Sequence, residues 1–360
     1  MTISHLGTTD ISSFGAELKT KAVIIEPEEA QAIALAQYGL QGTVKWLWGE
    51  KDSNYQLTLD DGTNYLLKIL NSGEAQAVTQ LHSKALMQAE KYDAGIPLQR
   101  IVKTVNGALD CRIVDKAGAE RGVRLVTFVS GVAQSQFKVS SKQRSNVGKM
   151  LARLQSALSS IELDSDLPPI IWDMKHASMM RDFLPLIDDQ ALRARLREAL
   201  DSFDNEVNPV LDKLPTQFIH NDFNPENILI DAQSPDEICG IIDFGDMAYS
   251  PVLFDTAVAV SYQLGTTETL LDDACDMLAG YSTIRRLSSL EIELLFPAII
   301  MRIVMRLTIS AWRASLFPEQ REHLLRFWPT LITQLRLLDY IGREEITRRF
   351  FTLFEETADE

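Results

Sequence analysis

Cysteine is scarce in this chain: only three of its 360 residues are cysteines, and no two of them form a C-x-x-C pair. They are Cys111, Cys239 and Cys275, which lie far apart in the sequence. A disulfide-stapled fold and a zinc knuckle both need paired or closely spaced cysteines, so neither is predicted. A reducing, cytoplasmic compartment is the simplest expectation.

Long apolar runs are also missing. The first twenty residues contain no apolar segment of the kind that a secretory signal requires, and Arg302 ends the apolar stretch at residues 294–301. We therefore expect no signal peptide, no membrane span and no membrane partner.

Basic residues are outnumbered by acidic ones. The chain has 35 Lys and Arg against 50 Asp and Glu, a formal net charge of -15. A broad positive surface for phosphate backbones is not expected, and we predict no nucleic-acid partner. Because 46% of the residues are hydrophobic, the chain can still bury a large core. A neutral or cationic small molecule fits this balance better.

Two kinds of periodicity follow one another along the chain. Residues 44–70 alternate in three short runs separated by turns, which predicts three antiparallel strands. Asn71 and Glu74 have the spacing of a capping box, and a helix is predicted after them. Strand-like runs then continue to residue 129, after which the pattern is mainly helical.

This change of pattern predicts an α+β chain with two domains behind a polar N-terminal tail at residues 1–21. Residues 22–129 are predicted to form a small antiparallel sheet with one helix. Residues 130–360 are predicted to form a larger, mainly helical domain. A β-rich island interrupts the helices between residues 218 and 242.

The island carries the most informative motifs of the chain. HNDFNPENILI, residues 220–230, is followed by GIIDFGD, residues 240–246. Asp222 and Asn227 are five positions apart, and Asp243 follows Asn227 by sixteen. Kinases supply a catalytic carboxylate, a metal-binding amide and a metal-binding carboxylate in this order along the chain.

Phosphoryl transfer requires Mg²⁺ held by hard oxygen ligands and a hydroxyl oriented for attack. We therefore predict that Asp222 accepts or orients the hydroxyl proton, and that Asn227 and Asp243 bind Mg²⁺. For either segment alone, a polar loop held by Asx turns is the alternative. The occurrence of both segments, in this order and at this spacing, favours the kinase interpretation.

These segments resemble the aminoglycoside phosphotransferase and choline kinase group within the protein-kinase-like fold, especially its hydroxylysine kinase and homoserine kinase branch. The resemblance runs from about Glu26 to the C-terminal helices. It includes YLLKI at residues 65–69, GIP at residues 95–97 and the pair Trp172 and Asp173. It implies a fold of two lobes, with ATP or GTP bound in the cleft between them.

The resemblance also implies nucleotide-binding residues in the first lobe. Lys68 matches the lysine that reaches the α and β phosphates, with an exposed strand lysine as the alternative. Ser53 and Asn54 belong to the turn expected to cover the phosphates. That turn is not a G-x-G-x-x-G loop, so a plain polar hairpin is the alternative. Val126 and Phe128 occupy the hinge where backbone groups would contact the base.

The chain departs from the family pattern near these residues. Glu74 and Glu90 are the candidates to pair with the kinase lysine, but the first is expected to cap a helix and the second to face solvent, so the partner stays open. Asn221 stands where the group usually has glycine, which affects loop geometry. His220 is expected to brace the loop, and Asp255 to cap a helix.

Three further residues are candidates for contact with the acceptor substrate. Asp246 is suited to face an ammonium group, with a loop-bracing role as the alternative. Arg302 and Arg306 lie one helical turn apart among apolar residues. Buried guanidinium groups need partners, so these two either bind a substrate carboxylate or pair with Glu291 and Glu293.

The sequence thus predicts a kinase that uses Mg²⁺ to move the γ-phosphate of ATP or GTP to a hydroxyl of a small, amine-bearing acceptor. The expected acceptor is an amino alcohol or a hydroxy amino acid. An aminoglycoside-modifying phosphotransferase is the alternative enzyme, and a nucleotide-binding pseudokinase is the alternative from another class. A pseudokinase usually lacks Lys68, Asp222, Asn227 or Asp243, and this chain has them all. The oligomeric state is not predicted.

Overall fold

The computed structural model describes residues 24–49, 51–163 and 167–356, which divide into two compact units. The first unit contains the described residues up to Gln80, together with Val102–Thr127 and residues 167–171. The second contains Leu81–Ile101, residues 128–163 and the chain from Trp172 onward. The tail predicted at residues 1–21 lies outside the described residues.

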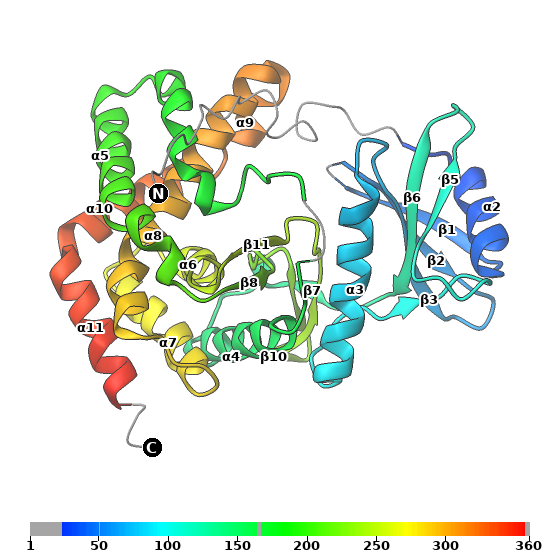
Figure 1. Cartoon of the computed structure of the whole chain (residues 1–360), viewed down its shortest axis with the longest axis horizontal. Helices are drawn as coiled ribbons and strands as arrows, with labels where there is room; N and C mark the ends of the chain where they lie inside the picture. The colour runs from blue at the N-terminus through cyan, green and yellow to red at the C-terminus, as the bar shows by residue number, and fades with distance from the viewer. Residues whose placement is uncertain (1–23, 50, 164–166, 357–360) are drawn as a thin grey trace, which may run out of the picture. The chain divides into compact units, whose positions relative to one another are not determined.

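An antiparallel sheet forms the centre of the first unit (Figure 1). Its strands follow the order β1-β2-β3-β6-β4, and β5 pairs with β6. The three strands predicted from the alternating runs are β1, β2 and β3, which lie side by side at one end of this order. The strands are β1 (Thr43–Leu47), β2 (Ser53–Thr58), β3 (Asn64–Ile69), β4 (Ile101–Val102), β5 (Cys111–Val114) and β6 (Glu120–Thr127).

Helix α2 (Pro27–Tyr38) covers one face of this sheet, and the sequence analysis did not predict it. Pro27 begins the helix, and Gly39 ends it in the left-handed conformation with a φ of 67°. Half of its buried residues are alanine, so the apolar periodicity that identifies a helix is weak. The sheet residues packed against it alternate along their strands: Tyr55, Leu57, Leu67, Ile69, Val123 and Leu125.

The second unit contains most of the helices and two small antiparallel sheets, ordered β10-β9-β7 and β11-β8. The strands are β7 (Val132–Ala133), β8 (Thr216–Ile219), β9 (Ile228–Asp231), β10 (Ser234–Ile241) and β11 (Ala248–Pro251). The α-helices of the chain after α2 are α3 (Gln76–Tyr92), α4 (Ser141–Leu158), α5 (Gln190–Glu206), α6 (Val252–Gln263), α7 (Leu270–Ser282), α8 (Ser289–Leu316), α9 (Arg321–Leu324), α10 (Trp328–Ile341) and α11 (Arg343–Glu356).

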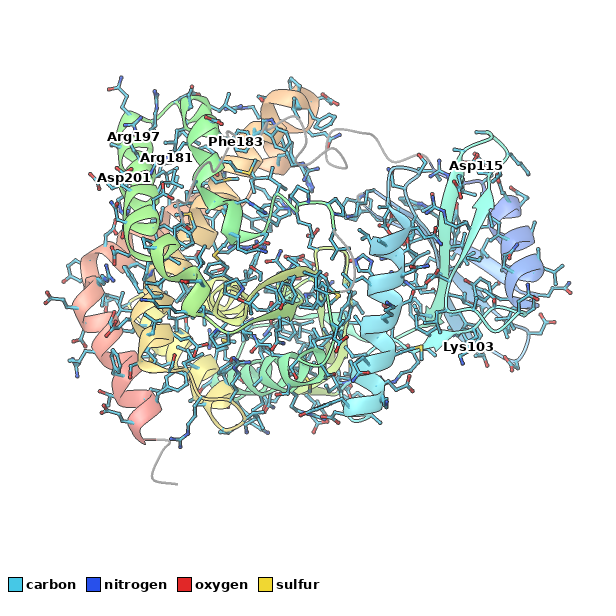
Figure 2. The ribbon with its side chains drawn as sticks, viewed as in Figure 1. Lys103, Asp115, Arg181, Phe183, Arg197 and Asp201 are labelled. Atoms are coloured by element: carbon cyan, nitrogen blue, oxygen red, sulfur yellow. The ribbon has the colours of Figure 1, made fainter. Side chains whose placement is uncertain are left out.

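Short 3₁₀ segments join several of these helices: η2 (Gln134–Gln136), η3 (Met174–Leu186), η4 (Asn208–Lys213) and η5 (Pro318–Gln320). η3 lies where the sequence pattern is helical, but it is a 3₁₀ helix that contains Pro185. Arg181 ties η3 to α5 through Asp201 and Asp204, at 2.7 and 2.6 Å (Figure 2). Phe183 stacks on Trp312 of α8, with ring centroids 5.1 Å apart.

Helix α8 is the longest described helix and is mostly buried. A capping box begins it: the Ser288 hydroxyl accepts a hydrogen bond from the Glu291 N–H, and the Glu291 carboxylate accepts one from the Ser288 N–H. Within the described ranges, no helix combines the length and the apolarity that a membrane crossing needs. Because α8 is buried along its length, its arginines stand next to interior groups.

Candidate active site

Two neighbouring loops carry the predicted catalytic and metal-binding residues. The catalytic loop, residues 220–227, connects β8 to β9, and the following loop, residues 242–247, connects β10 to β11. Ile228 of β9 pairs with Ile241 of β10. The Ile242 N–H then donates to the Asn227 carbonyl at 3.0 Å. The antiparallel register therefore places Asn227 and the segment leading into Asp243 at the same end of one ribbon.

His220 links the two loops. A ring nitrogen, Nε2, lies 3.1 Å from the Ile242 carbonyl, and the Asp222 N–H lies 3.3 Å from the other, Nδ1. A carbonyl only accepts and an amide N–H only donates, so Nε2 carries the hydrogen and Nδ1 the lone pair. The ring is fully buried beside Phe223 and Phe244. This agrees with the bracing role predicted for His220.

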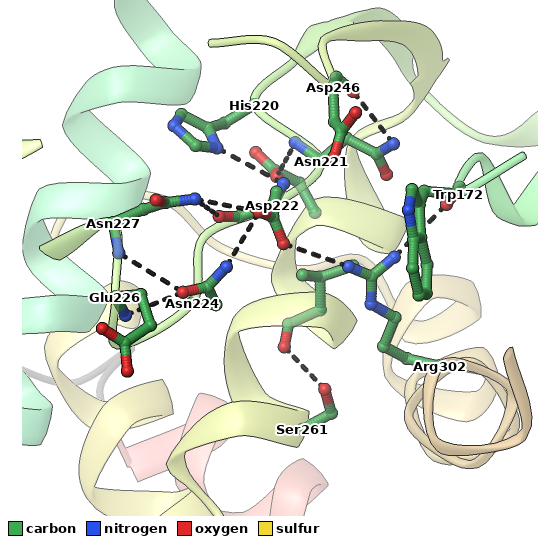
Figure 3. Close-up of polar contacts among 12 residues, drawn as sticks. Trp172, His220, Asn221, Asp222, Asn224, Glu226, Asn227, Asp246, Ser261 and Arg302 are labelled. Atoms are coloured by element: carbon green, nitrogen blue, oxygen red, sulfur yellow. Dashed lines mark hydrogen bonds and ion pairs between the residues drawn. The ribbon is translucent and has the colours of Figure 1, made fainter. Parts of the chain in front are cut away.

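The carboxylate of Asp222 is held by three side chains (Figure 3). Its Oδ2 accepts from Nδ2 of Asn224 at 2.8 Å and from Nδ2 of Asn227 at 2.9 Å. Its Oδ1 accepts from Nη2 of Arg302 at 3.2 Å. The side chain is 21% exposed, so a substrate can still reach it. The arrangement fixes the orientation of the carboxylate without enclosing it.

The predicted alternative of Asx turns is also present in both loops. Oδ1 of Asn224 accepts from the Glu226 N–H at 2.7 Å, and Oδ1 of Asp243 accepts from the Gly245 N–H at 3.1 Å. The turns shape the loops, while the contacts of Asn224 and Asn227 orient Asp222. The two interpretations therefore describe different atoms of the same residues.

Asn221 has a φ of 64°, in the left-handed region that L side chains seldom adopt. Its N–H donates to Oδ1 of Asp255 at 2.8 Å, and its Nδ2 donates to the Asp246 carbonyl at 3.0 Å. These two bonds hold the residue in a conformation that glycine, the usual residue of the family, would adopt without strain.

Asp255 is inside helix α6, which begins at Val252, so its predicted role as an N-cap is wrong. The side chain is fully buried, and burial raises the pKa of its carboxyl group. The electrostatic interaction with His220 and the hydrogen bond from the Asn221 N–H both lower this pKa and act against the effect of burial. The sequence signal that Asp255 accepts an internal hydrogen bond, here from the Asn221 N–H, was its position as a lone carboxylate in an apolar run. A buried carboxylate needs internal donors.

Asp243 also has a left-handed backbone, with a φ of 62°, and the residue is exposed. Strained non-glycine residues of this kind cluster at functional sites. Asp246 is half-buried, and its main chain accepts the bond from Asn221. This contact braces the loop, and the predicted contact of Asp246 with an ammonium group stays a prediction.

The predicted magnesium ligands have suitable chemistry. In the described part of the chain, no three or more His, Cys, Asp or Glu residues group to hold a metal. Mg²⁺ in kinases usually needs only one or two protein oxygens, because water and phosphate oxygens complete its shell. Nδ2 of Asn227 is bonded to Asp222, which leaves the amide oxygen for a cation. An amide oxygen and the Asp243 carboxylate are both hard donors, so the pair fits Mg²⁺.

Arg302 is almost completely buried, and its partner is Asp222 rather than a glutamate of its own helix. Its Nη1 donates to the Trp172 carbonyl at 3.3 Å, and its guanidinium lies 4.8 Å from the centroid of the Trp172 ring. Glu291 instead caps Ser288 and lies 3.9 Å from Arg285. The predicted alternative of an Arg302 to Glu291 pair is therefore wrong.

The residues predicted to bind nucleotide lie on two faces of the first sheet. Lys68 of β3 is opposite Asn54 of β2 and Arg124 of β6, so these side chains share the face away from the α2 core. Ser53 is on the core face, where its hydroxyl accepts from the Ile25 N–H at 3.0 Å.

Val126 and Phe128 lie at the end of the same region, in β6 and just after it. Val126 is buried and Phe128 is half-buried. The nucleotide contacts of these residues and of Lys68, Ser53 and Asn54 stay predictions.

Glu74 does not cap helix α3, which begins at Gln76. Its carboxylate accepts from the Thr79 hydroxyl at 2.9 Å. Burial and the nearby Asp52 raise its pKa, and the positive charge of Arg124 acts against this rise. Arg124 was not among the predicted partners of Glu74, although a buried arginine in the apolar part of β6 needs a partner.

Proteins with assigned activities match nearly the whole chain. Hydroxylysine kinase of Danio rerio is 24% identical over 327 residues, 87% of this chain and 91% of the relative. Homoserine kinase of Methylobacillus flagellatus is 27% identical over 301 residues, 83% of this chain and 88% of the relative. The predicted resemblance to these two kinds of kinase is confirmed.

Solved structures share the fold. A microcompartment-associated aminopropanol kinase has a TM-score of 0.65 and 18% identity, covering 87% of this chain and 100% of that one. An amicoumacin kinase in complex with AMP-PNP and Ca²⁺ has a TM-score of 0.63 and 14% identity, covering 83% and 93%. The predicted protein-kinase-like fold is confirmed.

A family model described as the phosphotransferase enzyme family matches residues 46–290, more than half of the chain. The match includes both loops of the site and the first sheet from the end of β1 onward. Together with the kinase relatives, it confirms the prediction of an enzyme that phosphorylates a hydroxyl group. The chain belongs to the phosphotransferase enzyme family.

Proposed function

We propose that this protein transfers the γ-phosphate of ATP or GTP to a hydroxyl of a small, amine-bearing molecule, and that Asp222 is its catalytic residue. The bond between the γ-phosphorus and its bridging oxygen breaks, and a bond to the acceptor oxygen forms. The hydroxyl proton passes to Asp222, and the nucleoside diphosphate leaves.

The orientation of Asp222 is the observation that carries this proposal. Three donors hold its carboxylate, from Asn224, Asn227 and Arg302, yet about a fifth of the side chain is exposed. A carboxylate oxygen accepts two hydrogen bonds, and from the described residues Oδ1 accepts one, donated by Arg302. Oδ1 is therefore the atom that would accept the bond from the acceptor hydroxyl.

Asn227 and Asp243 would hold Mg²⁺ beside this carboxylate. Bound there, the ion would supply positive charge for the oxygens of the phosphoryl group. Asn227 then has two tasks, because its amide nitrogen orients Asp222 while its amide oxygen remains for the metal. The side chains of Lys68 and Asn54 are proposed to contact the phosphates of the nucleotide, together with the main chain at Ser53, whose side chain is buried on the other face. Val126 and Phe128 are proposed to contact the base.

Residues 22–129 are proposed as the nucleotide lobe and residues 130–360 as the lobe that carries the catalytic groups and the acceptor. The names of the relatives support an acceptor that is an amino alcohol or a hydroxy amino acid. The net charge of -15 agrees with an amine-bearing molecule. All three cysteines are free, which supports the cytoplasm as the compartment.

The test is the release of nucleoside diphosphate from Mg²⁺-ATP or Mg²⁺-GTP in the presence of hydroxylysine, homoserine, ethanolamine, choline or an aminoglycoside. We expect turnover with at least one of the first three, and a fall of about 10²-fold or more in kcat for Asp222→Ala with unchanged nucleotide affinity. Asp243→Ala should weaken nucleotide binding only when Mg²⁺ is present.

Nucleotide binding without turnover on any acceptor would support a pseudokinase instead. An Asp222→Ala variant as fast as the wild type would remove the catalytic role of this residue. Identical nucleotide titrations of Asp243→Ala and the wild type, with and without Mg²⁺, would remove the metal role of Asp243.

A further inference from the structure

Arg306 of helix α8 is a charged group in the site region that the proposed reaction does not use. It lies one turn after Arg302, on the same side of the helix. Its guanidinium stacks 4.0 Å from the centroid of the Tyr262 ring. Among the described residues, the guanidinium of Arg306 has no hydrogen bond or ion pair, whereas that of Arg302 is bonded to both Asp222 and Trp172.

The surroundings of Arg306 leave its charge poorly compensated. The residue is half-buried, and burial together with the positive charge of Arg302 lowers the pKa of its guanidinium. Attraction to Asp222 and to Tyr262 acts the other way. An arginine stays charged in proteins, so its five donors remain directed at whatever occupies the adjacent space. A partly buried cation without an anion is costly, and a ligand anion would remove that cost.

The position of this cation is defined relative to the reacting group. The free acceptor site of Asp222 is on Oδ1, the oxygen that faces Arg302 (Figure 3). Arg306 follows Arg302 by four residues, and side chains at this spacing are neighbours on a helix surface. The guanidinium groups of Arg302 and Arg306 also lie 5.8 and 4.0 Å from the centroid of the same Tyr262 ring, so an acceptor whose hydroxyl meets Oδ1 of Asp222 has Arg306 nearby.

We propose that Arg306 binds the carboxylate of the acceptor, so that the preferred acceptor is a hydroxy amino acid rather than an amino alcohol. This inference rests on the proposed function, because it places the acceptor hydroxyl at Asp222. A guanidinium matches a carboxylate with two parallel hydrogen bonds. The Tyr262 ring holds the guanidinium plane for that contact, and Arg302 acts separately, as the positioning residue of Asp222.

The test compares pairs of acceptors that differ only in the carboxylate. The first pair is homoserine and 3-aminopropan-1-ol, and the second is hydroxylysine and 1,5-diaminopentan-2-ol. We expect the wild type to prefer the carboxylate member by about tenfold or more in kcat/KM. In Arg306→Met, kcat/KM for that member should fall about 10- to 100-fold, with the other member within about twofold. For the carboxylate member, kcat/KM of Arg306→Lys should lie between those of the wild type and Arg306→Met.

Arg336→Met is the matched control, because it removes the same charge from an exposed position on α10. It should keep the wild-type preference. The nucleotide KM of Arg306→Met should equal that of the wild type, and its thermal midpoint should be no lower, because the variant removes a partly buried cation that forms no ion pair within the described residues. On the wild type alone, 2-aminobutyrate should inhibit homoserine turnover at least about tenfold better than propylamine, which needs no variant.

Four results would overturn the inference. Both members of a pair falling equally in Arg306→Met would show that Arg306 does not recognise a carboxylate. A raised nucleotide KM in that variant would identify its ligand as a phosphate. A wild type that phosphorylates only acceptors without a carboxylate would leave the proposed kinase activity intact and remove the substrate class inferred here. A wild type that phosphorylates no acceptor would instead remove the proposed function, and the inference with it.

Discussion

The catalytic loop meets helix α8 at Asp222, on the face of the helix that carries Arg302 and Arg306, here called the arginine face. The side chains of the loop and of the arginine face are held in different ways. The side-chain amides of Asn221, Asn224 and Asn227 all donate to groups inside the loop or in the neighbouring loop. On α8, Arg302 is bonded to Asp222, while Arg306 has only the face of an aromatic ring among the described residues.

This difference separates positioning from recognition. Groups whose bonds are already made within the protein hold a reacting atom in place, and they need no ligand to do so. A group whose donors are unused is ready to bind something that arrives. In the proposed function, the loop therefore carries the chemistry, and Arg306 selects the substrate.

The largest expected effect would come from breaking the contact between the two regions. Arg302→Met keeps most of the buried volume but leaves Oδ1 of Asp222 without its donor. We expect kcat to fall about 10- to 100-fold, because a misoriented base loses much of its contribution. The nucleotide KM should stay within about twofold, since Arg302 is not assigned to the nucleotide. Steady-state kinetics with varied nucleotide and acceptor would measure both.

Arg302→Lys serves as the conservative variant and should recover part of the lost kcat. Equal kcat in Arg302→Met and the wild type would mean that the loop alone orients Asp222, and the comparison between the regions would lose its basis.

A smaller effect is expected from changes within the catalytic loop. Asn221→Ala keeps a left-handed backbone at a residue with a β-carbon and removes the bond to the Asp246 carbonyl. It should lower the free energy of unfolding by about 1–3 kcal/mol. Asn221→Gly loses the same bond but removes the strain, so it should lie closer to the wild type. Urea unfolding of the three proteins measures the difference. A glycine variant less stable than the alanine variant would contradict the strain argument.

The smallest effect should be a change in pH dependence at Asp255. The folded protein raises the pKa of this carboxyl above its ordinary value of 3.8, so the folded state binds its proton more tightly than the unfolded state does. The stability of the wild type relative to Asp255→Asn should therefore decrease as pH rises from about 4 toward the raised pKa. Urea unfolding at several pH values tests this. A stability difference that grows with pH would reverse the sign and exclude burial as the dominant cause.

Local patterns were sufficient to predict the strands of the first sheet and the motifs of the catalytic site. The alternating runs before residue 70 predicted β1, β2 and β3, because strand side chains alternate between faces. Helix α2 could not be predicted in this way, since half of its buried residues are alanine and its apolar periodicity is therefore weak.

The partners of buried charges were less predictable. Glu74 and Asp255 resembled caps in the sequence, yet one faces Arg124 and the other braces Asn221. A cap is recognised from a few neighbouring residues, whereas these partners are 50 and 34 positions away in the chain. Only the folded arrangement shows which distant group compensates a buried charge.

The amino-acid sequence by itself determined the order and spacing of Asp222, Asn227 and Asp243, since both loops are short and tied to adjacent strands of one ribbon. The tertiary structure alone decided that Arg302, 80 residues beyond Asp222, would become its partner, and that Arg306 would not have one within the described residues. Spacing along a ribbon is a local property of the backbone, but the packing of α8 against the site depends on contacts made throughout the second unit.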